Sequence, residues 1–436
     1  MTISLLALLA VTAAPAEPHL PVTGPGRPGM KSFDELMVSF IRTHGVPGAA
    51  LAVVRHGKLV YARGFGHADL DRKTPVRPDA LFRIASVSKP ITSAAIMQLV
   101  ERRKLSLSDR LLDVIPSRPH GRGQVDPDLK KVTIRHLLLH TGGWDRARSG
   151  DPMFRPVRIA KALGVPPPAG AGHVARYMLS VPLDFTPGSR HVYANVGYCL
   201  LGRVIEAKTG QTYEQHVRRH VLAPAGITRM RIGRTLGAHR AEGEVTYYTR
   251  KRQTAPCVFP PNVGRQVPQP YGAWHLEAMD AHGGWIASAI DLVRFARQFD
   301  PLVGGRILGP AGIAATFARP EGPAGFDKAG KPKAAYYAFG WMVRPVGKRG
   351  RANTWHAGAL AGSSALLGRR HDGLDWAVLF NMMHTAKGQV LAFAIDPLLH
   401  KAAAAVKVWP DVDLLEAGLL KDASASGDVE HVRPIW

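Results

Sequence analysis

The sequence predicts a mixed α/β fold of the α+β kind, in which helices flank an antiparallel sheet and a mainly helical domain is inserted between its halves. Two apolar, β-rich runs, AALAVVRHG and KLVYARGFG, lie at residues 49–66. Strand-like runs return near the other end of the chain as TWHAG, SSALLGRR and WAVLFN. Between these groups, helical segments alternate with Pro- and Gly-rich loops. Strands at both ends with helices between them indicate one interrupted sheet.

Local patterns predict the individual elements in chain order. Residues 32–43 carry apolar side chains at helical spacing. His56-Gly57 separates the two β-rich runs, as the turn of a hairpin would. A long helix is expected at about 86–103, and an Ala-rich helix at 391–406.

This order of elements predicts two interleaved domains within the 436 residues, rather than two or three domains in series. We expect a discontinuous α/β domain made of residues 30–110 and 276–410, an inserted helical domain at 111–275, and a C-terminal tail at 411–436. No internal apolar run reaches the roughly 18 residues that a membrane-spanning helix needs. We therefore expect no transmembrane segment in the mature chain.

The first 16 residues resemble a secretory signal peptide. Ile3 to Val11 is a short apolar run, and Ala14-Pro15-Ala16 supplies small residues of the kind found at a cleavage site. No Lys or Arg precedes the apolar run, which departs from the usual pattern, and an irregular N-terminus is the alternative. We expect a secreted or periplasmic protein.

Composition excludes several classes of protein and leaves charge as the unusual feature. Hydrophobic residues make up 46% of the chain, too many for a disordered protein. Two cysteines, Cys199 and Cys257, exclude a disulfide-rich scaffold and a cysteine-clustered zinc module, and whether they pair stays open. The net charge of +24 is typical of proteins with a polyanionic partner such as nucleic acid or an anionic surface.

The sharpest local signal is Ser86-Val87-Ser88-Lys89 within FRIASVSKPITSAAIMQLV. A Ser and a Lys three residues apart share one face of a helix. A serine hydroxyl is a poor nucleophile at neutral pH, and a neighbouring amine with a depressed pKa can take its proton. On spacing alone, a helix cap followed by an exposed Lys explains this pattern better.

Further segments change that balance. Together with the Ser-Lys segment, they resemble the serine β-lactamase and penicillin-binding-protein-like family, specifically its class C branch, which also holds D-stereospecific peptidases and esterases. The resemblance covers about residues 30–400. The segments follow in the expected order as VTIRHLLLHTGGW, FTPGSRHVYANVGYCLLGRVIEAKTG, GGWIASAIDLVRFA and TWHAGALAGSSALL.

The resemblance assigns roles to the first two motifs. It makes Ser86 the nucleophile and Lys89 its proton partner. The family's Tyr-x-Asn motif is Tyr193-Ala194-Asn195. A Lys cation favours a neighbouring phenolate, so we expect Tyr193 to shuttle protons, and Asn195 to contact Lys89 and a substrate carbonyl. Without the family context, a packing aromatic and a turn residue explain this pair.

The third motif departs from the β-lactamase pattern. Where many members have Lys-Thr-Gly, this chain has His356-Ala357-Gly358, which resembles the D-aminopeptidase members. The resemblance implies that Gly358 lets a substrate approach closely, and that the N–H groups of Ala359 and Ser86 form an oxyanion hole. His is mostly neutral near pH 7, so a constant cation is missing, and efficient β-lactam hydrolysis is disfavoured.

These motifs imply a serine hydrolase that acts through an acyl-enzyme on D-amino-acid peptides, short esters or, less favoured, β-lactams. The resemblance implies no metal or organic cofactor. The alternative is a non-turnover protein that binds peptidoglycan fragments as a sensor or scaffold. His136 and His140 have the spacing of a zinc pair, but H-E-x-x-H is absent, so we expect no metal. No nucleotide-binding loop is present, so a nucleotide cofactor has no support. No RNA- or DNA-binding motif is present either, and together with the expected export this leads us to expect no nucleic-acid partner.

The basic charge is concentrated in the predicted insertion. Residues 111–275 carry 24 Lys and Arg against 10 Asp and Glu, and residues 215–265 are the densest part. We expect this part to border the active site, where its cations would hold an anionic substrate or an anionic envelope surface such as peptidoglycan. Cations that are simply solvated are the favoured alternative. The candidates are Arg250, Lys251, Arg252 and Arg265.

Overall fold

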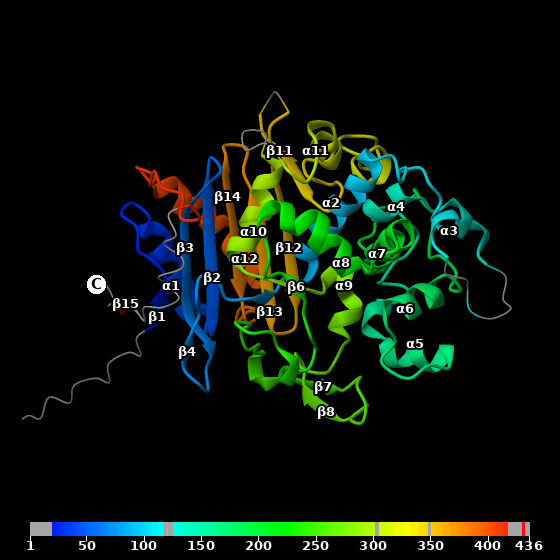
Figure 1. Cartoon of the computed structure of the whole chain (residues 1–436), viewed down its shortest axis with the longest axis horizontal. Coiled ribbons are helices and arrows are strands. Elements are labelled where there is room, and N and C mark those ends of the chain that lie inside the picture. The colour runs from blue at the N-terminus through cyan, green and yellow to red at the C-terminus, as the bar shows by residue number, and fades with distance from the viewer. Residues whose placement is uncertain are drawn as a thin grey trace, which may run out of the picture.

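The structure is a computed structural model, and it describes residues 20–116, 120, 125–300, 305–347, 350–416 and 430–431. The predicted signal peptide and most of the predicted tail lie outside the described residues. Figure 1 shows the large sheet on the left and the helices α3–α7 gathered on the right. Within the described residues, no helix is long and apolar enough to cross a membrane.

Ten strands of the described chain form one sheet in which every pairing is antiparallel. Its order is β10-β11-β12-β13-β14-β2-β3-β1-β15, and β4 pairs with β3. The strands are β1 (Pro21–Thr23), β2 (Gly48–Arg55), β3 (Lys58–Asp69), β4 (Thr74–Pro75), β10 (Tyr336–Tyr337), β11 (Met342–Pro345), β12 (Ala352–Leu360), β13 (Ser363–Arg369), β14 (Leu374–Phe380) and β15 (Glu430–His431). β14 joins β2, so strands from the two ends of the chain share the sheet as predicted.

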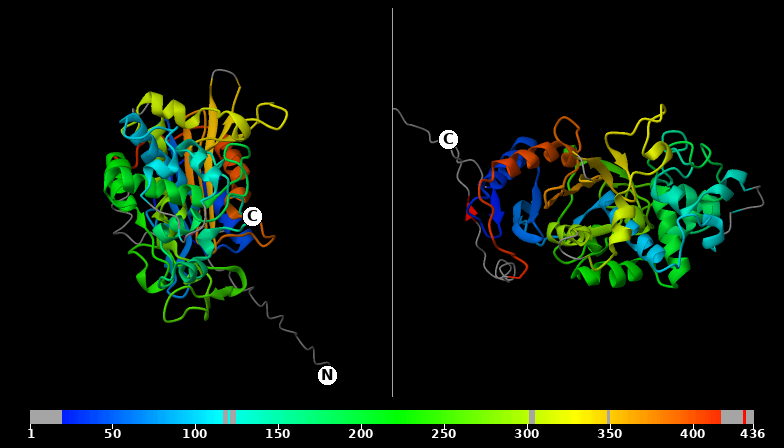
Figure 2. Two further views of the ribbon diagram at one scale, coloured as in Figure 1. Left: turned by 90° about the vertical axis from the view of Figure 1, so that its right-hand side faces the viewer. Right: turned by 90° about the horizontal axis from the view of Figure 1, so that it is seen from above.

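The alternation of side chains along each strand builds two apolar layers. In β2, Leu51 and Val53 pack with α1 (Lys31–His44) and α12 (Leu391–Ala405). These two helices lie next to each other when the molecule is seen from above (Figure 2, blue and orange-red). Ala52 and Val54 face the opposite way, toward the core that holds α2 (Ser88–Glu101) and α10 (Ala289–Ala296).

Several predicted elements are present. His56 and Gly57 both have positive φ, 47° and 79°, which is the backbone of a tight hairpin turn. The expected helices at 32–43 and 391–406 are α1 and α12. The long helix begins at Ser88 instead of Ser86, because a short 3₁₀ turn, η1 (Ala85–Val87), precedes it.

The helical region follows α2. It contains α3 (Leu111–Val114), α4 (Ile134–Leu138), α5 (Pro156–Leu163), α6 (Ala171–Met178), α7 (Asn195–Thr209) and α8 (Tyr213–Val217). α9 (Asp280–Gly283) and α11 (Pro310–Phe317) come later in the chain.

The later part of the predicted insertion also contacts the α/β body. β6 (Arg231–Ile232) and β5 (Phe82–Arg83) both pair with β9 (Trp285–Ala287). The Val245 N–H donates to Leu81 O at 3.0 Å. A separate hairpin is formed by β7 (Thr254–Pro256) and β8 (Gln266–Pro268).

Candidate active site

A strained turn presents Ser86 at the junction of the sheet and the helical region. Ala85 has φ of 45°, a conformation that non-glycine residues rarely adopt outside functional turns. Ser86 follows it in η1 and is half-buried. Ser86 therefore lies in the short turn before α2 and not within α2. Lys89, in the first turn of α2, still places its amine next to the Ser86 hydroxyl.

Lys89 is fully buried and has three polar neighbours. Its Nζ lies 3.0 Å from Ser86 Oγ, 2.9 Å from Asn195 Oδ1 and 2.8 Å from the carbonyl oxygen of His282. Burial lowers the pKa of Lys89 well below its usual range; Asp151 opposes this shift and Arg146 adds to it. A neutral amine with two fixed acceptors keeps its lone pair for the Ser86 hydroxyl.

Tyr193 completes the contacts of the nucleophile. Its hydroxyl donates to Ser86 Oγ at 2.8 Å, and Lys89 Nζ lies 4.7 Å from the centre of its ring. Burial raises the pKa of Tyr193, so the phenol keeps its proton. The expected phenolate form of Tyr193 is therefore wrong, because burial outweighs the effect of the nearby Arg146 cation on the Tyr193 pKa. Burial also lowers the pKa of Lys89, so Lys89 is a weaker source of positive charge than expected.

Asn195 is held in place from two sides. Its Oδ1 accepts from Lys89, and its Nδ2 donates to Asp151 Oδ2 at 2.7 Å. The other Asp151 oxygen caps η3 (Pro152–Phe154) by accepting from Met153 N. This contact fixes which way the Asn195 amide faces.

His356 lies on β12 beside the Ser86 cluster and is buried. Its Nε2 lies 3.1 Å from the Tyr337 hydroxyl, and its Nδ1 lies 2.8 Å from Ala357 O. Burial lowers the pKa of His356 to about 3, with a smaller contribution from Lys89. The side chain is therefore neutral at pH 7. Its ring centre is 6.4 Å from that of Tyr193.

Gly358 brings β12 against the nucleophile turn. A methyl group in its place would clash with Ile84 O and would lie 3.2 Å from Ser86 N. Ala359 follows on the strand and pairs with Ser364 of β13. The structure thus brings Ser86, Gly358 and Ala359 to one place, beside the Lys89 cluster.

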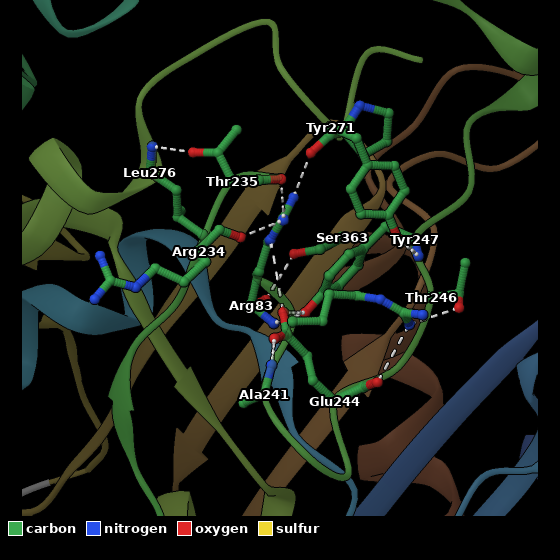
Figure 3. Close-up of polar contacts among 12 residues, drawn as sticks. Arg83, Arg234, Thr235, Ala241, Glu244, Thr246, Tyr247, Tyr271, Leu276 and Ser363 are labelled. Carbon is green, nitrogen blue, oxygen red and sulfur yellow. Dashed lines mark hydrogen bonds and ion pairs between the residues drawn. The ribbon is translucent and has the colours of Figure 1, made fainter. Parts of the chain in front are cut away.

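A buried hydrogen-bond network around Arg83 supports both the turn that carries Ser86 and the β12–β13 hairpin that carries Ala359 (Figure 3). Arg83 is fully buried, and its guanidinium donates to the carbonyl oxygens of Pro270, Arg234 and Thr235. Its backbone oxygen accepts from Ser363 Oγ at 2.6 Å. Arg83 is three residues before Ser86, and Ser363 begins β13 opposite the end of β12. One residue therefore links the nucleophile turn to the hairpin that carries Ala359.

Sequence reasoning missed four contributors to the site: Asp151, Tyr337, His140 and the carbonyl of His282. The ring of His140 lies 4.3 Å from that of Tyr193, centre to centre, and its Nδ1 accepts from Ala194 N at 3.2 Å. Burial lowers the pKa of His140 well below its usual value, so the ring is neutral. Its backbone φ of 55° is unusual for a non-glycine residue and marks His140 in the structure. No pattern in the sequence marks this residue as part of the site.

Two other sequence features have structural roles. His136 accepts from Thr133 N in the capping box of α4, so His136 and His140 serve different purposes. Within the described residues, no cluster of three or more His, Cys, Asp or Glu could hold a metal ion. Cys199 and Cys257 are buried free thiols and do not pair.

The four cations singled out in the basic segment lie in different settings. Arg250 is partly buried and lines a cavity that also contains Ala359. Lys251, Arg252 and Arg265 are exposed, and they are absent from the described lining of that cavity.

An antiparallel sheet with a helical region beside it, and a Ser-Lys-Tyr cluster at their junction, define the β-lactamase and penicillin-binding-protein class. The chain matches the family model described as Beta-lactamase over residues 33–399, and it belongs to that family.

Two curated relatives and one solved structure show the range of the family. Esterase EstB of Burkholderia gladioli is 34% identical over 199 residues, which cover 45% of this chain and 49% of the esterase. Penicillin-binding protein 4* of Bacillus subtilis is 25% identical over 356 residues, or 78% of this chain and 69% of that protein. The chain thus spans about half the length of the esterase.

The D-amino acid amidase from Ochrobactrum anthropi SV3, in its complex with L-phenylalanine amide, superposes with a TM-score of 0.65 at 20% identity. The match covers 87% of this chain and 98% of the amidase. At this identity the similarity shows the shared fold.

Proposed function

We propose that the protein is a serine hydrolase that cleaves ester or amide bonds through an acyl-enzyme on Ser86. The observation that carries the proposal is the position of Ser86 Oγ, 3.0 Å from the buried Lys89 amine and 2.8 Å from the Tyr193 hydroxyl. The names of the relatives, an esterase, a penicillin-binding protein and a D-amino acid amidase, support ester and amide substrates. D-amino-acid peptides and short esters are favoured over β-lactams, because His356 supplies no cation for their carboxylate.

Acylation follows from the contacts of Ser86. Neutral Lys89 accepts the hydroxyl proton while the Ser86 oxygen attacks the substrate carbonyl carbon. The backbone N–H groups of Ser86 and Ala359 would hold the oxyanion that forms, which is the role of preorganised donors in acyl transfer. Gly358 leaves room for this approach, since any larger residue meets Ile84 O.

The leaving group departs on the side of Tyr193. The Tyr193 phenol keeps its proton because burial raises its pKa, so it can donate that proton to the departing oxygen or nitrogen. The Lys89 ammonium then returns its proton to Tyr193, and both groups regain their starting states. Hydrolysis of the acyl-enzyme runs the same transfers with water as the attacking group.

Turnover and labelling of the Ser86→Ala variant test this proposal. We expect the wild-type protein to hydrolyse p-nitrophenyl butyrate and to react with a fluorophosphonate probe, and Ser86→Ala to do neither. Turnover that survives Ser86→Ala would contradict the nucleophile assignment. Labelling at Ser86 without turnover would favour the alternative, a protein that binds peptidoglycan fragments as a sensor or scaffold. Ser88→Ala is a matched control, because Ser88 is buried on α2 and does not contact Lys89 Nζ in the described contacts.

We also propose that the protein is exported, to the periplasm or outside the cell, and acts near an anionic envelope. The apolar run before Ala14-Pro15-Ala16 and the net charge of +24 support this proposal. N-terminal sequencing of protein from fractionated cells checks it: a mature chain that begins near residue 17 supports export. An intact N-terminus in the cytosolic fraction would contradict it. Sedimentation with purified peptidoglycan tests the envelope contact.

A further inference from the structure

A cavity of about 490 Å³ lies at the end of β12 that is remote from His356. Its wall includes the last two residues of the strand, Ala359 and Leu360, and the turn that follows at Ala361 and Gly362. Its size falls within the range of small-molecule binding sites. The cavity therefore opens directly beside one of the two expected oxyanion donors.

The order of residues along β12 gives the cavity a role in the proposed reaction. His356 lies beside Tyr193, the proton donor to the leaving group, and Gly358 lies against Ser86. A substrate that extends along the strand places its leaving group near His356 and its acyl group in the opposite direction. The acyl group then enters the cavity beyond Ala359.

One part of the cavity wall is apolar, as a site for a hydrocarbon chain or a ring would be. Phe154, Trp274, Met382 and Met383 contribute to it. Phe154 is 45% exposed although it is a large apolar residue, and it ends η3, which Asp151 caps. Because Asp151 also binds Asn195, this wall is tied to the Ser86 cluster.

Another part of the wall carries an unbalanced positive charge. Arg250 Nε donates to His384 O at 3.1 Å, and Arg250 Nη2 donates to the carbonyl of His44. These bonds hold the guanidinium at the cavity wall, and no described hydrogen bond engages Nη1. Among the described residues that line the cavity, none is Asp or Glu, and no described ion pair engages Arg250. Burial, Arg250 and Lys387 lower the pKa of the neighbouring His44, which is therefore neutral at pH 7.

Another cavity has a wall that is rich in arginine, and there the positive charges are paired with carboxylates. Around that cavity, of about 660 Å³, Asp79 accepts from both Arg77 and Arg229, and Glu242 and Glu244 also line the wall. Charge in that cavity is largely balanced by carboxylates of the chain itself. At the first cavity, the carboxylate of a bound ligand would neutralise the positive charge of Arg250.

We propose that this cavity is the acyl-group site, and that it selects acyl groups with an apolar stem and a terminal carboxylate, which Arg250 binds. The inference rests on the proposed hydrolase function and narrows its substrate class. A charge-assisted hydrogen bond in such a setting changes affinity by about 10- to 100-fold. Of the four cations named in the basic segment, the proposal assigns direct contact with the substrate to Arg250.

Pairs of p-nitrophenyl esters of equal chain length test the proposal. The monoesters of adipate and suberate carry a terminal carboxylate, and the esters of hexanoate and octanoate do not. The measured quantity is the ratio of kcat/KM between the acidic and the neutral ester of each pair. We expect wild-type protein to favour an acidic ester, and Arg250→Gln to reduce that ratio by about 10-fold or more. Arg252→Gln is the matched control, because Arg252 is exposed, lies two residues away and does not line the cavity.

The outcomes separate this inference from the function on which it rests. A ratio that equals one in the wild type, or that falls equally in both variants, overturns the carboxylate site while ester hydrolysis stays in place. A protein that hydrolyses none of the four esters and does not react with a fluorophosphonate at Ser86 overturns the proposed function, and this inference with it.

Discussion

Lys89 combines complete burial with contacts to Ser86, Asn195 and the His282 carbonyl. A buried ammonium is costly unless its environment compensates, and the Asp151 carboxylate is linked to Lys89 through Asn195. Burial lowers the pKa of Lys89 well below its usual range, which favours the neutral amine that can act as a base. Perturbed side chains of this kind are concentrated at functional sites.

Replacing Lys89 by Ala removes the proton acceptor of the proposed mechanism. We expect Lys89→Ala to lower the rate of acylation by several orders of magnitude while the protein stays folded. Stopped-flow measurement of p-nitrophenol release gives the rate, and circular dichroism checks the fold. A loss smaller than tenfold would mean that Lys89 is not the proton partner of Ser86.

The depressed pKa of Lys89 also predicts how stability depends on pH. A lysine whose pKa is lower in the folded state binds fewer protons there than in the unfolded chain. Its contribution to the free energy of unfolding therefore rises with pH, from the depressed pKa up to the ordinary value near about 10.4. Lys89→Met lacks this contribution, so its stability relative to wild type should fall as pH rises from 7 to 10. Urea unfolding at several pH values measures the difference, and a constant difference would contradict the prediction.

At the scale of elements, the separation of η1 and β12 sets the proposed oxyanion hole. Ser363 and Ser364 are adjacent and both fully buried, yet they point to different partners. Ser363 Oγ donates to Arg83 O, below the Ser86 turn, and Ser364 Oγ accepts from Ala392 N of α12 on the other face. Ser363 therefore supports the site through Arg83, whereas Ser364 supports the packing of α12 on the sheet.

We expect Ser363→Ala to lower kcat by about 10- to 100-fold with a smaller change in KM, because a small displacement of a preorganised donor is costly in catalysis. Ser364→Ala should destabilise the fold by about 1 kcal/mol and leave kcat near the wild-type value. Steady-state kinetics and thermal unfolding of both variants provide the comparison. Equal kcat losses in the two variants would show that the Arg83 link has no special part in positioning.

Much of the element pattern could be predicted from local sequence. Apolar, β-rich runs predicted the strands around the His56-Gly57 turn, and helical spacing predicted α1. The start of α2 could not be placed in this way, because the η1 turn depends on the strained Ala85 and on contact with Gly358 from the other end of the chain. The first residue of a helix such as α2 is therefore determined by contacts between segments that are distant in the sequence.

The candidate site divides in the same way. Ser86 and Lys89 share a motif, and the family resemblance pointed to Tyr193, Asn195 and His356. Their partners lie far away in sequence and in unremarkable contexts: Asp151 is 44 residues from Asn195, and His282 is 193 residues from Lys89. The protonated state of Tyr193 also required the structure, because burial and not a neighbouring charge determines the direction of its pKa shift.

At the scale of the whole molecule, the proposed site lies at the junction of the sheet and the helical region, in a chain whose net charge is +24. Exposed cations act on a charged substrate over distances that salt controls, since the Debye length falls from about 30 Å at 0.01 M to about 3 Å at 1 M. The field of the protein should therefore matter for acidic substrates and not for neutral ones.

Across that range of ionic strength, we expect kcat/KM for an acidic ester to fall by about 10-fold or more, and that for the neutral ester of equal length to change little. The two esters share a leaving group, so the comparison isolates the charge of the substrate. An acidic ester whose hydrolysis is independent of salt would mean that the surface cations are simply solvated.

The central claim is that Ser86 carries the acyl group, and locating a covalent adduct tests it most directly. Trypsin should release residues 84–102 as one peptide, because Pro90 blocks cleavage after Lys89. After reaction with a fluorophosphonate, fragmentation of this peptide should place the added mass on Ser86, and the Ser86→Ala protein should gain none. An adduct on another residue, or an equal adduct in the Ser86→Ala protein, would contradict the account.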